Sequence, residues 1–168
     1  MTRTTAEGRS IIASDEDVVA VQYEHTPMFA HSLLWTTDGP ADPAGGGATV
    51  PASFIPAPGA SVAMTVTFAP DRVYSDPSFD FAAAGAEALR NTPGLADTFE
   101  PDAPGMHTTS TVDYVVVLDG PVTLEVDDQA AVTLNTGDVV VQNAARHAWR
   151  VPGDDPATIL VVLMGARV

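Results

Sequence analysis

Apolar and turn-forming residues alternate regularly over the C-terminal part of the chain. From residue 105 onward, short apolar runs such as "DYVVVLDG", "PVTLEVDD" and "TILVVLM" are separated by Gly, Asp, Asn or Pro. Runs of this kind at intervals of about ten residues are typical of the strands of a β-sandwich or small barrel. The pattern therefore predicts an all-β fold for residues 105–168.

The first hundred residues have a weaker pattern that proline and glycine interrupt. Residues 38–60 ("DGPADPAGGGATVPASFIPAPGA") have no periodicity and are expected to form a loop. Residues 76–94 are rich in alanine and predict the one helix, which the Pro-Gly pair at the end of this range should terminate. Strands are predicted at residues 9–13, 18–23, 29–36 and 61–68.

The length of the chain indicates one domain, because 168 residues can bury one sizeable core. We expect residues 1–104 to supply N-terminal strands, the Pro/Gly-rich loop and the short helix, all packed on a core formed by residues 105–168. The sequence leaves open whether the loop covers a binding site as a lid.

Charge and composition exclude several classes of function. The chain has 22 acidic and 7 basic side chains, for a net charge of −15, which repels phosphate backbones and anionic membranes. It has no cysteine, which excludes disulfides, zinc fingers and thiol nucleophiles. We find no P-loop, no G-x-G-x-x-G and no G-x-S-x-G, so no nucleotide cofactor is expected. The N-terminus lacks the apolar region of a signal peptide, and a soluble, cytoplasmic protein without nucleic-acid or membrane partners is expected.

The stretch "GMHTTSTVDYVVVLDG" (residues 105–120) resembles the first conserved motif of the cupin superfamily. That motif consists of a glycine, a spacer, His-x-His, three or four residues, a glutamate, six residues and a second glycine. His107, Thr109, Asp113 and Gly120 stand at its last four positions. Threonine therefore replaces the second histidine of the motif, and aspartate replaces its glutamate.

A second stretch, "GDVVVQNAARHAWRV" (residues 137–151), resembles the second cupin motif. Gly137 and His147 match it, with one residue fewer between them, while Asn143 and Ala145 stand where proline and glycine are expected. The resemblance implies a cupin-type jelly-roll β-barrel with an irregular N-terminal extension and one short helix.

The resemblance also implies a metal site. Residues two apart on a strand share a face, so His107 and Thr109 should both point into the barrel. Asp113 and His147 should join them from adjoining strands. Two imidazoles and one carboxylate hold Fe(II) in many proteins, and Zn, Mn or Ni accept the same ligands. His107, Asp113 and His147 are therefore the expected metal ligands and catalytic residues. The alternatives are a hydrogen-bonded structural role for each histidine and a solvent-exposed strand-edge carboxylate at Asp113.

Several polar and aromatic residues near these motifs are candidates for a substrate pocket. Aromatic rings supply large buried area whether or not a ligand is present, so their alternative role is packing. The amide of the one glutamine among them could instead bond to backbone at the barrel edge. The candidates are Thr109, Tyr114, Gln142 and Trp149, together with Trp35 if its segment folds over the mouth of the barrel.

The leading hypothesis is an enzyme that acts on a small aromatic or polyketide-like molecule inside the barrel. A divalent metal would polarise a carbonyl or enol oxygen during cyclisation, dehydration, decarboxylation or isomerisation. The resemblance implies a place in secondary metabolism or aromatic degradation, and a homodimer that packs or exchanges its N-terminal strands. The alternatives are an Fe(II)-dependent dioxygenase and a metal-free cupin, either a small-ligand binding module or an acid–base enzyme that uses His147 and Asp113.

Overall fold

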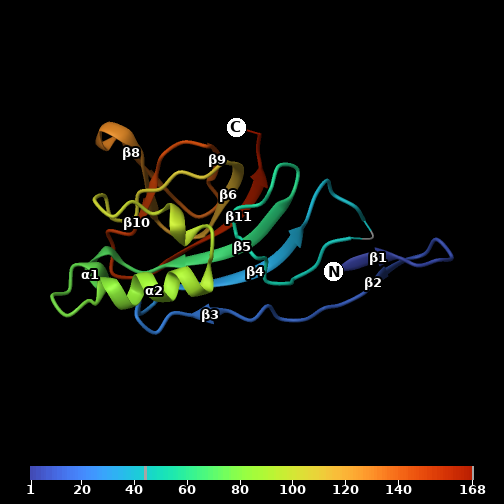
Figure 1. The fold of residues 1–168 in the computed structure, drawn as a ribbon. Helices are drawn as coiled ribbons and strands as arrows, with labels where there is room; N and C mark the ends of the chain where they lie inside the picture. Colours follow the sequence, from blue (N-terminus) through green and yellow to red (C-terminus); the bar gives the residue numbers. More distant parts are fainter. Residues whose placement is uncertain (44, 168) are drawn as a thin grey trace.

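The computed structural model describes residues 1–43 and 45–167 and contains two facing antiparallel β-sheets (Figure 1). The larger sheet has the order β3 (Val21–Gln22), β4 (Ala30–Thr37), β5 (Ser61–Phe68), β11 (Ala157–Gly165), β6 (Thr111–Asp119) and β9 (Val139–Asn143). The smaller sheet has the order β10 (Ala148–Arg150), β7 (Val122–Glu125) and β8 (Ala131–Leu134). The predicted all-β jelly roll is confirmed.

The core lies between the two sheets and follows the period-two pattern of the strands. On β5, Val62, Met64 and Val66 are buried, whereas the residues between them are only partly buried. Val122 and Leu124 of β7 are buried on the facing sheet and belong to the same hydrophobic cluster. Since successive side chains of a strand point to opposite faces, each strand sends every second residue into the barrel. Burial of these apolar faces is the main term that stabilises the fold.

The main helix, α2 (Phe81–Asn91), covers part of the larger sheet (Figure 1). It begins after Asp80, whose carboxylate accepts a hydrogen bond from the Ala83 amide at 2.9 Å, as an N-cap does. The helix is therefore shorter than the predicted range of 76–94. The residues before Asp80 form a turn in which the Asp76 carboxylate accepts two hydrogen bonds from Ser78. Three further short helices are α1 (Asp71–Tyr74), η1 (Ala96–Thr98) and η2 (Asp127–Gln129).

A buried carboxylate attaches α2 to the loop between β3 and β4. Glu87 is only 5% exposed and accepts hydrogen bonds from the backbone amides of Glu24 and His25, each at 2.8 Å. Burial raises the pKa of Glu87, but the two amide donors outweigh this effect, and its pKa is lowered overall. The ionised carboxylate thus connects the helix to the loop that precedes β4.

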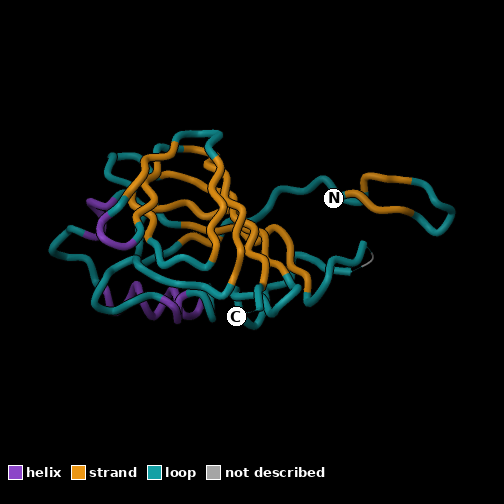
Figure 2. The backbone as a smooth tube through the Cα atoms, turned by 90° about the horizontal axis from the view of Figure 1, so that it is seen from above, coloured by secondary structure: helices purple, strands orange, loops and turns teal. Residues whose placement is uncertain are grey.

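The N-terminal residues form a hairpin, of which the sequence predicted only the second strand, at residues 9–13. β1 (Thr2–Thr4) pairs with β2 (Ser10–Ile12), and the hairpin extends away from the barrel in both views (Figures 1 and 2). The strand predicted at 18–23 is confined to Val21–Gln22, which pair with His31 and Ala30 of β4. None of the helices in the described part of the chain is both long and apolar enough to cross a bilayer.

Candidate functional site

Two histidines from segments that precede β6 and β10 lie side by side inside the barrel. The backbones of His107 and His147 pair with each other through two N–H···O=C hydrogen bonds of 3.0 Å. Their ring centroids are 4.3 Å apart, and the two residues are only 7% and 4% exposed. The spacing of the two sequence motifs thus brings together one predicted pair of site residues.

Each imidazole is fixed by a hydrogen bond of the same kind, from its Nδ1 to the backbone carbonyl two residues earlier. Nδ1 of His107 lies 3.1 Å from the carbonyl oxygen of Gly105, and Nδ1 of His147 lies 2.9 Å from that of Ala145. A carbonyl oxygen only accepts, so each Nδ1 carries a proton and donates it. In the neutral ring Nε2 then has a free lone pair. Neither Nε2 has a hydrogen-bond partner among the residues that the structure describes.

Both rings are neutral at pH 7. Burial lowers the pKa of His107, while its bond to the Gly105 carbonyl and the negative charge of Glu100 oppose this effect. Burial, and then repulsion from His107, lower the pKa of His147 to about 4. The pair therefore presents two unprotonated Nε2 atoms, and it accommodates at most one proton near neutral pH because a second positive charge would be repelled.

Aromatic rings extend from the histidine pair along the interior. His147 meets the edge of Trp149 at a centroid distance of 5.9 Å, and Trp149 stacks on Phe68 at 6.1 Å. Phe29 follows at 6.0 Å from Phe68. On the other side, Phe99 lies 4.6 Å from the ring of His107. Trp149 thus lies in the interior as expected, and the site has a flat, apolar lining.

Asp113 and Gln142 face each other on neighbouring strands, β6 and β9. Both are 5% exposed, and Asp113 Oδ1 and Gln142 Nε2 have no hydrogen-bond partner within residues 1–43 and 45–167. Burial raises the pKa of Asp113 to about 6, and a hydrogen bond with Thr111 moderates this rise. The Thr109 hydroxyl is 2.7 Å from that of Thr111, so hydroxyls fill the inward row between His107 and the carboxylate.

The three expected ligands do not form one metal site. Within residues 1–43 and 45–167, no three His, Cys, Asp or Glu side chains are close enough to hold an ion. Asp113 follows His107 by six positions, and an extended chain advances about 3.3 Å per residue, which places the carboxylate further along the inward row. The two Nε2 lone pairs suit a metal, but a two-histidine, one-carboxylate centre needs the third donor. The donor set therefore does not fit that centre.

Two of the expected pocket residues lie on the outer face of the larger sheet, which corrects the sequence-based expectation. Tyr114 is adjacent to Asp113 on β6, so it points outward and is 50% exposed. Trp35 pairs with Ala63, whose side chain also points outward. The Trp35 indole lies against Gly46. A register shift on β4 just before Trp35 puts it on the outer face, which the sequence pattern does not reveal.

An ion pair that the sequence analysis missed holds a loop beside the histidines. The Arg146 guanidinium donates to both carboxylate oxygens of Glu100, at 2.7 and 2.6 Å, and to Asp127 at 2.7 Å. This bidentate contact fixes the segment that carries Phe99 next to the segment that carries His147, just before β10. The position of Arg146 directly before a motif histidine was the one feature of the sequence that pointed to a role at the site. Glu100 lies 46 residues away in sequence and could not be paired with it by pattern.

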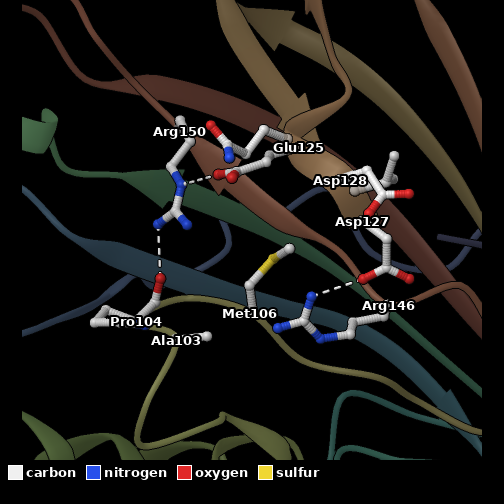
Figure 3. A pocket seen from close by; sticks show the side chains of 10 residues that line it. Ala103, Pro104, Met106, Glu125, Asp127, Asp128, Arg146 and Arg150 are labelled. Atoms are coloured by element: carbon white, nitrogen blue, oxygen red, sulfur yellow. Dashed lines mark hydrogen bonds and ion pairs between the residues drawn. The ribbon is translucent and has the colours of Figure 1, made fainter.

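A cavity of about 320 Å³ is lined by Met106 and Arg146, which directly precede the two histidines in sequence (Figure 3). Arg150 and Glu125 line it and are joined by a 2.7 Å hydrogen bond, with Met106 and Pro104 nearby. Arg150 points to the opposite side of β10 from Trp149, because adjacent strand residues alternate. This cavity is therefore separate from the aromatic interior.

The fold and the inward-facing histidine pair define a jelly-roll domain with a polar site inside an apolar barrel. Residues 98–163 match the family model described as a cupin domain, and the predicted membership of the cupin superfamily is confirmed. This part of the chain is a cupin domain.

Curated relatives match a shorter segment. The chain is 47% identical over 45 residues to phomopsin biosynthesis cluster protein C' of Diaporthe leptostromiformis, covering 27% of this chain and 24% of the relative. It is 43% identical over 49 residues to oryzines biosynthesis cluster protein J of Aspergillus oryzae, covering 29% and 27%. The match thus spans about a quarter of the length of either relative. A solved Salmonella typhimurium structure, titled as an ethanolamine utilization protein, aligns over 99% of this chain and 94% of its own at 11% identity and a TM-score of 0.48.

Proposed function

We propose that this protein is an enzyme of small-molecule biosynthesis that moves a proton on its substrate through the neutral imidazoles of His107 and His147. The observation that carries the proposal is the pair of buried rings, 4.3 Å apart, whose Nδ1 protons are held by backbone carbonyls. A fixed, unprotonated imidazole nitrogen is a general base, and base-catalysed isomerisation and dehydration next to a carbonyl group begin with removal of a proton. Isomerisation or dehydration is the reaction class that this site supports best.

The surroundings assign different roles to the two rings. His107 is the better proton acceptor, because the charge of Glu100 stabilises its protonated form whereas His147 is further weakened by repulsion from His107. Arg146 positions Glu100 for this role. His147 accepts a hydrogen bond from the substrate at Nε2. The protonated His107 then returns the proton to another carbon or to a departing hydroxyl.

The apolar lining supports an aromatic or polyketide-like substrate. The Trp149 indole stacks with Phe68 and lies next to His147, so a planar molecule would contact rings on one side and a base on the other. The relatives that match part of the domain are biosynthesis cluster proteins, which agrees with a role in secondary metabolism.

The test combines metabolite analysis with a metal measurement. A producing strain without this gene should accumulate a precursor that purified protein converts to an isomer or dehydrated product. Conversion should survive chelator treatment without consuming oxygen, and His107→Ala should reduce it roughly 100-fold or more. Stoichiometric metal whose removal abolishes conversion would favour the metal-assisted reaction instead. Iron-dependent oxygen uptake would favour a dioxygenase, and binding without conversion would favour a ligand-binding module.

We also propose a homodimer built by the N-terminal hairpin. The hairpin and the linker after it expose Ile12 (76%) and the adjacent pair Val18 (51%) and Val19 (84%), and exposed apolar residues that group together are typical of interaction sites. Residues 1–12 contain two arginines and one glutamate, whereas the remaining residues contain five arginines and 21 acidic residues. A basic hairpin is therefore attracted to the acidic body of a second copy.

The outer face of β6 and β9 is the proposed docking surface. It exposes Tyr114 (50%), Val139 (63%) and Val141 (58%), and β9 is the end strand of its sheet. Light scattering should give twice the chain mass of 17.4 kDa, and deletion of residues 1–19 or Val141→Lys should give the single mass. A full chain that is monomeric at micromolar concentration would overturn the proposal.

A further inference from the structure

Three buried polar atoms have no hydrogen-bond partner among the residues that the structure describes: His31 Nδ1, Asp113 Oδ1 and Gln142 Nε2. The last two are of opposite character and lie on paired strands. Asp113 Oδ1 is an acceptor without a donor, and Gln142 Nε2 is a donor without an acceptor. Each residue is 5% exposed, so bulk water does not compensate them. An unpaired buried polar atom costs about 1–3 kcal/mol, and native structures contain few of them. Two such atoms on directly paired positions of β6 and β9 therefore require a common explanation.

The two groups are adjacent without bonding to each other. Opposed residues of antiparallel strands have Cβ atoms about 4.5–5.5 Å apart, and both side chains point inward. One oxygen atom that both donates and accepts can join two such groups, since each hydrogen bond spans about 2.8 Å. A hydroxyl group has this property, because it donates to the carboxylate and accepts from the amide.

We propose that Asp113 and Gln142 form a recognition pair for a hydroxyl group of the substrate. This proposal rests on the proposed function in placing the substrate inside the barrel. The pair is set in apolar surroundings: Leu163 pairs with Asp113 on β11, and Val115 follows it on the inward face of β6. The substrate class is thus a hydroxylated molecule whose remaining surface is apolar or aromatic.

The position of the pair also explains why the motif carboxylate is not with the histidines. Asp113 lies on the inward row beyond Thr109 and Thr111, whose hydroxyls bond to each other at 2.7 Å. Val140, the inward neighbour of Gln142 on β9, is only partly buried. A molecule that spans from the histidines to Asp113 would have its reacting group at one end and its hydroxyl at the other.

Two small probes that differ by one oxygen test the pair directly. Benzyl alcohol and toluene are titrated into the full chain, and their dissociation constants are measured from backbone amide shifts. Gln142→Met should reduce the preference for the alcohol over toluene roughly 5- to 10-fold, the effect of one lost hydrogen bond. Asp113→Leu should have the same effect and provides an answer if Gln142→Met does not fold. Gln22→Met, at an exposed position of β3, is the matched control and should leave the preference unchanged.

The outcomes separate this proposal from the proposed function. An unchanged preference in both variants, or no binding of benzyl alcohol to the wild-type chain at millimolar concentration, would overturn it and leave water alone as the occupant of the pair. His107→Ala should retain the preference even though it removes the proposed base. A failure of proton transfer would therefore not alter this result.

Discussion

Asp113→Asn should make the protein more stable at neutral pH. The carboxyl group is 5% exposed, and burial raises its pKa to about 6 from an ordinary value of 3.8. Above pH 6 the group is charged in both the folded and the unfolded state, and its burial as an ion opposes folding. The difference between these two pKa values corresponds to about 3 kcal/mol. Asparagine has nearly the same shape and no charge, so it removes this cost.

The direction of the pH dependence follows from the raised pKa. Between pH 6 and 3.8 the folded protein binds the proton that the unfolded chain lacks, so stability from this group increases as the pH falls. The advantage of Asp113→Asn over the wild type should therefore be about 3 kcal/mol at pH 7.5 and should disappear near pH 4. For a chain of this size, 3 kcal/mol corresponds to an increase in Tm of about 6–12 °C.

Denaturant unfolding followed by tryptophan fluorescence measures this difference at each pH. Asp119→Asn, an exposed carboxylate at the end of the same strand, is the matched control and should change stability by less than about 0.5 kcal/mol. If Asp113→Asn is no more stable than the wild type at pH 7.5, or if its advantage does not change with pH, the carboxylate is not a buried charge and the reasoning is refuted.

Two further substitutions test contacts that support the site. Glu87→Gln should destabilise the protein by about 2 kcal/mol above pH 4.5, because glutamine keeps only one of the two acceptor oxygens. The loss should vanish as the pH falls below the lowered pKa of this glutamate. The control Glu16→Gln, at an exposed position, should leave stability unchanged in the same denaturant titration. Arg146→Gln should speed hydrogen exchange in residues 99–106, while global stability changes by less than about 1 kcal/mol. The control Arg72→Gln breaks an exposed ion pair and should leave exchange in residues 99–106 unchanged. Equal exchange in both variants would contradict the positioning role of Arg146.

Strands with one buried face could be predicted closely from the sequence. The predicted strand 61–68 coincides with β5, because "SVAMTVTF" alternates strictly and each apolar residue enters the core. β1 could not be predicted, because "TRT" is polar and exposed throughout and its pairing with β2 is not encoded in an apolar pattern. The start of α2 depended on a hydrogen-bonded turn at Asp76, which propensity does not reveal.

The candidate site, too, could be predicted from the sequence only in part. Motif spacing predicted that His107 and His147 would be neighbours, since both motifs flank strands that meet in the barrel. It could not predict that Asp113 would pair with Gln142 instead of joining the histidines, because that depends on the register of β6 against β9. The Arg146–Glu100 contact joins a motif edge to an irregular segment, where no periodicity connects the partners.

The protonation state of the two imidazoles tests the central claim most directly. In long-range ¹H–¹⁵N spectra of the histidine rings at pH 7, we predict that His107 and His147 are both neutral and carry their proton on Nδ1, with an unprotonated Nε2. His147 should remain neutral down to about pH 5, given a pKa of about 4. A proton on Nε2 of either ring, or a positive charge on either ring at pH 7, would contradict the proposed base.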